Sequence, residues 1–383
     1  GKYCKHSKSM MTIKKVGSKA ELAKFIDFPH ELYKDDVHYV PELHIAQRDI
    51  LTPGKHPFHE HSTLQAFLLY NNDKIIGRIA AILNNNYNQF NHCHEGFFGF
   101  FEVIENKQAA KMLFDAAEEW LKEKKVTAIL GPANPTTNDP TGLLIDGFDA
   151  PPVAMMTYNK PYYASLLEEL GYKKKTDLLA YDLPTQTVDQ RSVKLRASLE
   201  QRLQHKGIVV RPINMKDFNN EVEKLLQVYN AAWDKNLGFV PMTEAEFRYL
   251  AKDLKMILDK DFCLVAEHNG KMIGFALAIP DINQILIKIK KGRLLPTGIF
   301  KLLLGKKKID YVRVLALGVT EPYRKLGIEA CFYARIIEKA KGKNIRGGEA
   351  SWILEDNEMM NKGLEHLNAK LYKRYRVVEK IVS

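Results

Sequence analysis

The chain has 383 residues, of which 45% are hydrophobic and 27% charged, a composition typical of a folded globular protein large enough for two domains. No apolar run approaches the roughly 20 residues that a membrane-spanning helix needs, which argues against an integral membrane protein. The formal charge of +11 at pH 7 favours anionic partners, but by itself it does not choose among nucleic acid, acidic lipid and phosphate-bearing cofactors.

The start of the chain and its cysteines bear on localisation. Residues 1–8 are basic and polar and have no apolar segment of the kind found in a signal peptide. Cys4, Cys93, Cys263 and Cys331 are isolated, without a C-x-x-C pair. We interpret them as free thiols and expect a cytoplasmic protein.

The first half predicts a hairpin, a central strand and a helix. Residues 64–70 and 75–82 are strand-like and flank a turn at Asn72-Asp73. A second apolar stretch at 96–104 predicts a strand, and helical spacing predicts a helix over 107–122. The intervening turn, Glu105-Asn106-Lys107, has no glycine, and Glu105 would repel a phosphate.

Two features of the first half leave alternatives open. The histidines at positions 56, 59, 61, 92 and 94 lack a zinc-site spacing, so surface histidines or an acceptor pocket are favoured over a metal site. The polar loop from Gly131 to Asp139 is of a functional kind and would contact an acceptor if it faced the second half. Turn formation explains the same residues and is the favoured interpretation.

A change of composition places the boundary between the halves. A polar, helix-favouring segment over 187–206 ends at Gly207, and a new strand begins at 208–212. We expect a first domain over 11–184, a helical linker over 185–206 and a second domain over 207–383.

Two pairs of segments repeat at one offset. The turn and strand from Asn72 correspond to those from Asn269, 197 positions further on. The helix end and strand start at 167–173 correspond to 364–370 at the same distance. Two matches at one offset favour duplication of a domain.

The second half contains a basic segment. No acidic residue occurs from Ile282 to Ile309, whereas seven lysines and Arg293 do. A solvated insertion is the favoured interpretation, and a contact surface for an anionic partner is the alternative.

The most informative stretch is a predicted strand, turn and helix over 311–343. The strand 311–319 is apolar and β-branched, and helical spacing resumes at Ala330. The turn between them contains Arg324-Lys325-Leu326-Gly327-Ile328. Because a basic, glycine-bearing turn that opens a helix presents free N–H groups and a positive dipole end, it can hold a diphosphate.

This turn resembles the acyl-coenzyme A loop of the GCN5-related N-acetyltransferase (GNAT) family, which reads Arg/Gln-x-x-Gly-x-Gly/Ala. Arg324 and Gly327 fit the pattern, whereas Glu329 stands where the family has glycine or alanine. The resemblance implies an α/β fold with a mixed sheet, here as two tandem acyl-coenzyme A N-acyltransferase-like domains. Because the first half lacks the loop, we expect only the second to bind the coenzyme.

The resemblance also implies site residues. Trp233 and Phe239 fall where the acceptor-binding loops of the family lie, and core packing is the alternative for both. The pantetheine arm of acetyl-coenzyme A would lie along Leu317, Gly318 and Val319. Asn357 matches the family asparagine after the following strand. The diphosphate would be held by main-chain N–H groups of the loop and helix start, at Arg324, Lys325, Leu326, Gly327, Ile328 and Ala330.

The catalytic candidates are less complete. The usual family tyrosine falls on Leu364, which cannot donate a proton; Tyr372 is either its replacement or a packed aromatic. Glu349 and Glu355 are an even number of residues apart on a predicted strand, so they are expected to share one face. Either could accept the proton of the amine. Exposed carboxylates are the favoured alternative for both.

The sequence therefore predicts a cytoplasmic N-acetyltransferase that moves an acetyl group from acetyl-coenzyme A to a small-molecule or peptide amine, with no metal. A sensor that binds acyl-coenzyme A or a metabolite without catalysis is the alternative, since Glu329 and Leu364 depart from the active pattern. Nucleic acid is not favoured as a partner, although the basic segment could bind it or an acidic membrane. The oligomeric state stays open.

Overall fold

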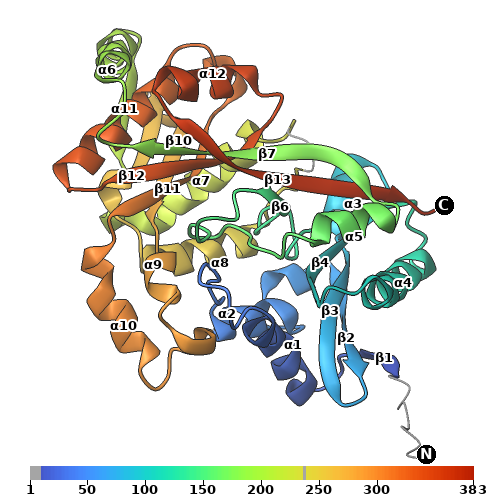
Figure 1. Cartoon of the computed structure of the whole chain (residues 1–383). Coiled ribbons are helices and arrows are strands. Elements are labelled where there is room, and N and C mark those ends of the chain that lie inside the picture. The colour runs from blue at the N-terminus through green and yellow to red at the C-terminus, as the bar shows by residue number, and fades with distance from the viewer. Residues whose placement is uncertain (1–9, 236–238) are drawn as a thin grey trace, which may run out of the picture.

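A computed structural model describes residues 10–235 and 239–383. Within this part of the chain, one mixed sheet runs through the molecule and helices cover its two faces (Figure 1). The predicted mixed α/β class is therefore confirmed. No helix in the described residues combines the length and the apolar character needed to cross a bilayer.

The first half forms one end of the sheet. Helix α4 (Lys107–Glu123) packs on one face through Leu113, Phe114 and Leu121, and helices α1 (Lys19–Leu32) and α2 (His44–Leu51) cover the other. The short helix α3 (Asn85–Asn91) joins β3 to β4. The strands lie in chain order: β1 (Met11–Lys15), β2 (Thr63–Asn71), β3 (Lys74–Leu83), β4 (Glu95–Val103) and β5 (Ala128–Gly131).

The second half repeats this plan at the other end. Helix α11 (Ile328–Gly342) and helix α6 (Gln190–His205) cover one face, whereas α7 (Phe218–Ala232) and α8 (Glu244–Lys255) cover the other. Two short helices, α9 (Asn283–Leu286) and α10 (Gly298–Gly305), precede β11. The strands are β8 (Ile208–Pro212), β9 (Cys263–His268), β10 (Lys271–Pro280), β11 (Tyr311–Val319) and β12 (Gly347–Leu354).

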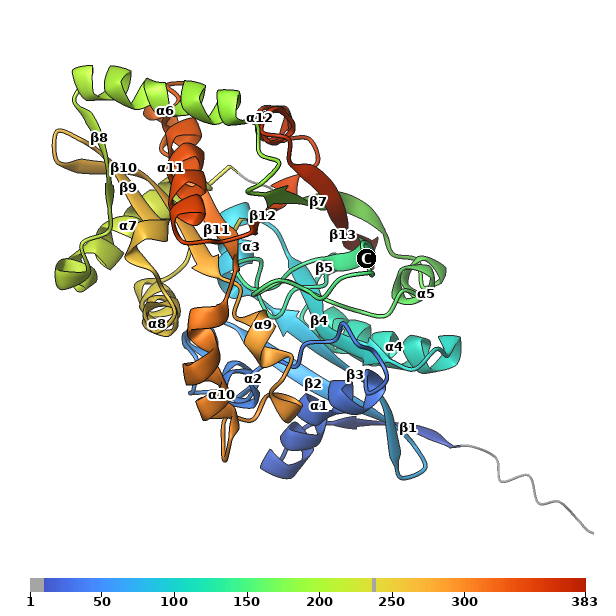
Figure 2. The ribbon, with the colours of Figure 1, turned by 60° about the vertical axis from the view of Figure 1, so that its left-hand side comes forward.

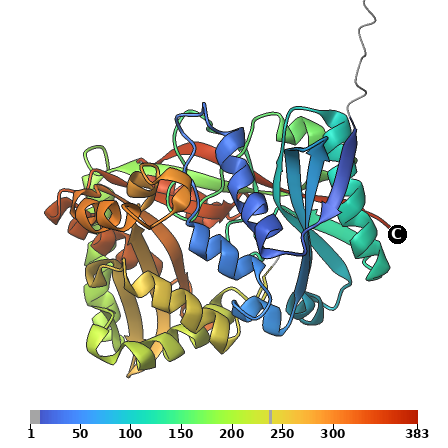
Figure 3. The same ribbon diagram turned by 90° about the horizontal axis from the view of Figure 1, so that it is seen from below.

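The two halves exchange their last strands. Helix α5 (Tyr163–Glu169) leads into β7 (Lys173–Pro184), and helix α12 (Glu358–His366) leads into β13 (Lys370–Ile381). Strand β7 pairs with β12 of the second half, and β13 pairs with β5 of the first half and with β7. The short strand β6 (Leu143–Asp146) also pairs with β13. The green and red strands therefore run from one half into the other in Figure 3.

The predicted repeat has a structural counterpart. Asn72 and Asn269 both adopt left-handed backbone angles, with φ of 56° and 51°, in the two hairpin turns. Gly171 and Asn368, also 197 positions apart, both have positive φ between the helix and the last strand of each half. Left-handed positions favour glycine and asparagine, which explains why these residue types recur there.

Helix α6 belongs physically to the second half. Figure 2 shows it lying across α11, and Leu203 is buried in the same core cluster as Ile328 and Phe332. Because the sheet is continuous and its last strands are exchanged, neither half buries its core alone. We keep 11–184, 185–206 and 207–383 as a proposed division of the chain.

Candidate functional site

The site begins where two parallel strands separate. Strands β11 and β12 pair only from Tyr311 opposite Gly347 to Val314 opposite Ala350. Beyond this point β11 carries one extra residue, Leu315, opposite β10. Strand β12 carries an extra residue opposite β7, near Trp352, whose φ is 59°. Such bulges redirect strands, so a gap opens between the ends of β11 and β12.

The predicted pantetheine-binding residues, Leu317, Gly318 and Val319, lie on the β11 side of this gap. A side chain on Gly318 would come within 2.5 Å of the Trp233 ring, so glycine here permits close packing between β11 and the residue that ends α7. Trp233, whose role was left open, thus lines the gap, while Phe239 is buried against Phe90 and Tyr229.

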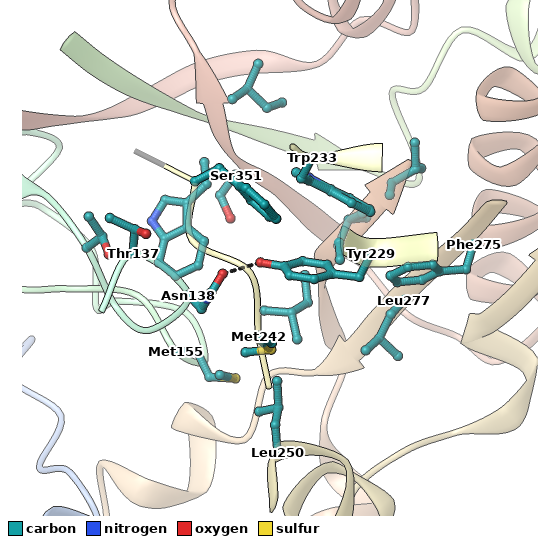
Figure 4. Close-up of a pocket in the computed structure, with 18 of the residues that line it drawn as sticks. Thr137, Asn138, Met155, Tyr229, Trp233, Met242, Leu250, Phe275, Leu277 and Ser351 are labelled. Atoms are coloured by element: carbon teal, nitrogen blue, oxygen red, sulfur yellow. Dashed lines mark hydrogen bonds between the residues drawn. The ribbon is translucent and has the colours of Figure 1, made fainter. Parts of the chain in front are cut away.

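A cavity of about 360 Å³ opens beside the gap. Figure 4 shows Tyr229, Trp233 and Phe275 on one side of it and Met155, Met242 and Leu250 below. Most of its lining is aliphatic or aromatic, so the cavity suits an apolar group. The lining comes from α7, α8, β10, β11, β12 and loops of the first half, and includes Phe247, Leu250, Ala251, Leu254, Leu277 and Leu317.

Polar groups stand at a few points of this apolar wall. The Tyr229 hydroxyl donates to Asn138 Oδ1 (Figure 4), and Asn138 Nδ2 donates to the Val240 carbonyl at 3.0 Å. The loop from Gly131 to Asp139 therefore faces the second half, and its contact with an acceptor stays a prediction. Ser351 lines the cavity from β12.

A second cavity, of about 350 Å³, lies between the start of α11 and helix α12. Tyr333 and Met360 line both cavities, so the two adjoin. Three cationic side chains, Arg196, Lys325 and Lys362, line the second cavity along with Glu329. The charge of this second cavity therefore suits an anion, whereas the first cavity suits an apolar group.

The start of α11 has the geometry predicted for diphosphate binding. Gly327 is the N-cap residue, with φ of +89° and no side-chain cap. The N–H groups of Ile328, Glu329 and Ala330 come before the first helical hydrogen bond, which runs from Cys331 N–H to Gly327 O. Such groups at a helix start are free to bind an anion.

The other predicted loop residues hold the turn in place. Arg324 points away from the helix start and donates to the carbonyls of Val319 at 3.1 Å and Ala232 at 2.8 Å. Leu326 packs against the second-half core, while Lys325 is exposed. Burial raises the pKa of Glu329 despite the opposing effect of Arg324, which reduces the negative charge that this departure from the family pattern brings.

The corresponding helix of the first half starts with a side-chain cap. Asn106 is the N-cap of α4, and its side chain accepts a hydrogen bond from Ala109 N–H at 2.9 Å. A side chain of the protein thus occupies the position that an anion would take. That only the second half binds the coenzyme stays a prediction.

The structure brings two of the predicted catalytic residues together. The Tyr372 hydroxyl donates a hydrogen bond to Glu349 Oε2; the Glu349 side chain is fully buried and that of Tyr372 is partly buried. Burial, followed by the nearby charge of Glu349, raises the pKa of Tyr372 far above its usual value, so this hydroxyl is a weaker acid than a free phenol. Neither residue lines the apolar cavity.

Arg313 connects this pair to the cavity wall. Its Nε donates to Ser351 Oγ at 2.8 Å, and its guanidinium lies 4.5 Å from the Trp352 ring centre. Burial lowers the pKa of Arg313 to about 10, while the negative charge of Glu349 acts in the opposite direction, so the guanidinium stays charged at neutral pH. Glu349 is followed on β12 by Ala350, which lines the cavity.

Several buried polar atoms around this pair have no hydrogen-bond partner among the described residues. They are Arg313 Nη2, Glu349 Oε1, Trp352 Nε1 and the Tyr375 hydroxyl. Buried polar atoms in native proteins are normally paired, so such a concentration indicates places for bound water or for polar atoms of a ligand.

The prediction that Glu355 shares a face with Glu349 is wrong. The bulge near Trp352 breaks the alternation of β12, and Glu355 lies beyond the end of that strand. Its carboxylate forms ion pairs with Lys174 at 2.9 Å and Arg374 at 3.4 Å near the surface. Glu355 is thereby separated from the cavity.

Two further positions concern the family asparagine and tyrosine. Asn357 is the N-cap of α12, accepts from Met360 N–H at 3.2 Å and lines the apolar cavity. Leu364 is buried in one core cluster with Tyr333. The Tyr333 hydroxyl, which contacts Met360 Sδ at 3.7 Å, lies where the two cavities meet. The sequence analysis missed Tyr333, since its helical spacing is also that of a core residue.

The histidines that were weighed as zinc ligands contact α8 and its neighbours instead. His61 Nε2 lies 3.0 Å from Glu246 Oε1, His56 packs edge-on against Tyr249, and His59 Nε2 lies 2.8 Å from the Ile50 carbonyl. In the described residues, no three His, Cys, Asp or Glu side chains are arranged to hold a metal ion.

One carboxyl beside the cavity predicts a pH effect on stability. Protein atoms surround the Asp139 carboxyl, although part of the residue reaches solvent, and this burial raises its pKa from 3.8 to about 7. As the pH rises from about 4 to about 7, the unfolded carboxyl ionises first, so the folded state loses stability. Asp139→Asn should remove this loss. The difference in Tm between the variant and the wild type should therefore be more positive at pH 8 than at pH 4. The exposed Asp146→Asn is the control, and an equal pH dependence of the two variants would contradict the assignment.

Comparisons with known proteins bear on this geometry. A model of the acetyltransferase (GNAT) family matches residues 28–139, within the first half. Protein YghO of Escherichia coli (strain K12) is 36% identical over 369 residues, which cover 95% of this chain and 93% of that protein. The bacterial ceramide synthase of Caulobacter vibrioides is 34% identical over 380 residues, covering 95% and 96%.

Solved structures share the fold. A tandem GNAT protein from the clavulanic acid biosynthesis pathway superposes with a TM-score of 0.56 at 11% identity, covering 97% of this chain and 98% of that one. A GCN5-related N-acetyltransferase from Sphaerobacter thermophilus gives a TM-score of 0.52 at 13% identity, covering 97% and 95%. The tandem arrangement predicted from the internal repeat is therefore found in a solved structure.

Proposed function

Because the chain belongs to the GCN5-related N-acetyltransferase (GNAT) family, we propose that it transfers an acyl group from an acyl-coenzyme A to an amine, with the coenzyme bound in the second half. One observation carries the proposal. The gap between β11 and β12 lies where a cationic cavity at the start of α11 adjoins an apolar cavity of about 360 Å³. A molecule with a diphosphate at one end and an acyl chain at the other matches this pair.

The coenzyme would follow the gap. Its diphosphate would bind the free N–H groups from Leu326 to Ala330, with Lys325 as a nearby cation and Arg324 holding the turn. Its pantetheine arm would lie along 317–319. The thioester would then reach the cavity near Ser351 and Asn357.

We further propose that the acyl group is a long chain. The sequence predicted acetyl-coenzyme A, but an acetyl group would fill little of a cavity whose volume falls within the roughly 300–1,000 Å³ of small-molecule sites. The relative named bacterial ceramide synthase adds support, since a ceramide is an amide of a fatty acid and a long-chain amino alcohol. We therefore propose a fatty acyl-coenzyme A as donor and the amine of a small amphipathic molecule as acceptor.

The chain's own residues would supply a proton acceptor and an oxyanion donor. The amine nitrogen attacks the thioester carbonyl, the carbon–sulfur bond breaks, and the nitrogen loses a proton. Glu349 would take this proton through ordered water, because its Oε1 is unpaired and the cavity wall lies one residue away. Tyr372 would position Glu349. Main-chain N–H groups of β11 facing the gap would stabilise the oxyanion, and Tyr333 or water would protonate the thiolate.

Chain-length preference tests the proposed donor. Thiol release should be faster with fatty acyl-coenzyme A than with acetyl-coenzyme A when a long-chain amine is present. Ala251→Phe, which projects from α8 into the cavity, should lower kcat/KM for long chains by about fourfold per excluded methylene and spare acetyl-coenzyme A.

Lys252→Phe, on the exposed side of the same helix, is the matched control and should leave the preference unchanged. If the wild-type enzyme instead prefers acetyl-coenzyme A, the original prediction of an acetyl group as the transferred group would hold. Coenzyme binding without thiol release across a broad amine panel would favour the sensor alternative.

A further inference from the structure

Helix α10 exposes an unusually apolar surface. Figure 1 shows this helix at the edge of the molecule. Phe300, Leu303 and Leu304 are 62%, 64% and 77% exposed, and Leu295, just before the helix, is 75% exposed. Ile299 and Met256, the latter at the end of α8, extend the exposed apolar side chains. Large exposed apolar residues gathered in one place mark an interaction site more often than solvated surface.

The helix is firmly held on its other side. Gly298, Leu302 and Gly305 face inward, and Gly305 packs closely against Ile285 of α9. Arg293 forms an ion pair with Asp27 of the first half at 3.0 Å, and Lys306 donates to the Met256 carbonyl. The outward position of the apolar side chains is therefore fixed by contacts at both ends of the segment.

Exposed positive charge lies along the same segment as these apolar side chains. The exposed lysines are Lys288, Lys290, Lys291, Lys301, Lys306, Lys307 and Lys308. Of these, Lys301 and Lys306 donate to main-chain carbonyls, and none forms a side-chain ion pair with a described residue. No acidic residue occurs from 282 to 309. An apolar face bordered by unpaired lysines is the pattern of a helix that lies in a membrane interface.

We propose that α10 and its flanking lysines dock this protein on an anionic phospholipid bilayer. Phe300, Leu303 and Leu304 would enter the boundary between headgroups and acyl chains while the lysines contact anionic headgroups. A second copy of the chain fits poorly, because two such lysine-rich surfaces would repel each other across the interface. Nucleic acid would use the lysines but leave the leucines and Phe300 exposed to water.

The docking surface lies close to the apolar cavity. Lys306 contacts the end of α8, and the inner face of α8, at Phe247, Leu250, Ala251 and Leu254, lines that cavity. A substrate carried in the bilayer would thus have a short route to the site, a consequence that rests on the proposed function. The docking itself does not rest on it, and vesicle binding is measured without any substrate.

Vesicle co-sedimentation tests the proposal. We expect the wild-type protein to bind vesicles made of phosphatidylglycerol and phosphatidylcholine in equal parts, with affinity falling as salt rises, and to bind pure phosphatidylcholine weakly. Phe300→Ser with Leu304→Ser should reduce binding by about tenfold or more, because their apolar burial is lost. Lys307→Gln with Lys308→Gln should reduce it by about fivefold per lysine.

Leu195→Ser is the matched control, since Leu195 is a comparably exposed leucine on α6 and should bind like wild type. Absence of wild-type binding at low salt, or equal binding by the Phe300/Leu304 variant, would overturn the proposal. So would sedimentation analysis showing a wild-type dimer that this variant disrupts, which would assign the surface to self-association. Loss of vesicle binding with unchanged thiol release from soluble substrates would support docking and the enzymatic function separately.

Discussion

Gly327→Glu is expected to weaken acyl-coenzyme A binding by about 100-fold or more, measured by calorimetry with coenzyme A. Three effects act together. The position has φ of +89°, a side chain there would come within 2.8 Å of Leu199, and the added carboxylate would face the diphosphate. Losing two charge-assisted hydrogen bonds of about 1.5–3 kcal/mol each is enough for this decrease.

Two control variants separate these effects. Gly327→Ala keeps the backbone strain and the contact with Leu199 but adds no charge, so it should weaken binding less. Lys107→Glu places the same charge at the start of α4, where Asn106 caps the helix, and should not change binding. Equal loss at Lys107 and Gly327 would contradict a single coenzyme site in the second half.

Glu349→Gln is expected to lower kcat by about 10²–10⁴-fold, the usual contribution of a general base. The amide keeps the shape of the carboxyl but does not accept the amine proton. The change also removes a negative charge that favours the charged form of the buried Arg313, so the variant should be less stable than the wild type. Thermal unfolding should therefore accompany the kinetics, and kcat should be compared below the Tm of the variant.

Glu355→Gln is the matched control. Its carboxylate lies near the surface in ion pairs with Lys174 and Arg374, where a pair is worth about 0–1 kcal/mol, so kcat and Tm should change little. Tyr372→Phe should lower kcat by less than Glu349→Gln, since it removes only the hydrogen bond that Glu349 accepts. A folded Glu349→Gln variant with wild-type kcat would remove Glu349 from the mechanism.

Local signals explain what the sequence analysis anticipated. Asparagine turns at Asn72 and Asn269 mark the two hairpins because these positions need left-handed backbone angles. The strand, glycine turn and helix around Gly327 combine three local patterns, and all three are present. The capped start of α4 follows from Asn106, a residue type that favours N-cap positions.

Features that depend on distant residues were not visible. The exchange of β7 and β13 pairs strands about 200 residues apart in the chain, and no local propensity specifies that pairing. The bulge near Trp352 adds one residue to the strand, and a single extra residue reverses the alternation of side chains. Glu355 therefore does not lie on the face that was expected. Composition revealed the charge of the basic segment, whereas the exposure of Phe300 and Leu304 depends on how Gly298 and Gly305 pack α10 inward.

A crystal structure with a bound fatty acyl-coenzyme A tests the central claim most directly. We expect one coenzyme per chain, with its diphosphate on the main-chain N–H groups that open α11 and its acyl chain in the cavity beside Trp233 and Leu250. A nucleotide bound at the start of α4, or an acyl chain lying outside the cavity while the gap between β11 and β12 stays empty, would contradict it.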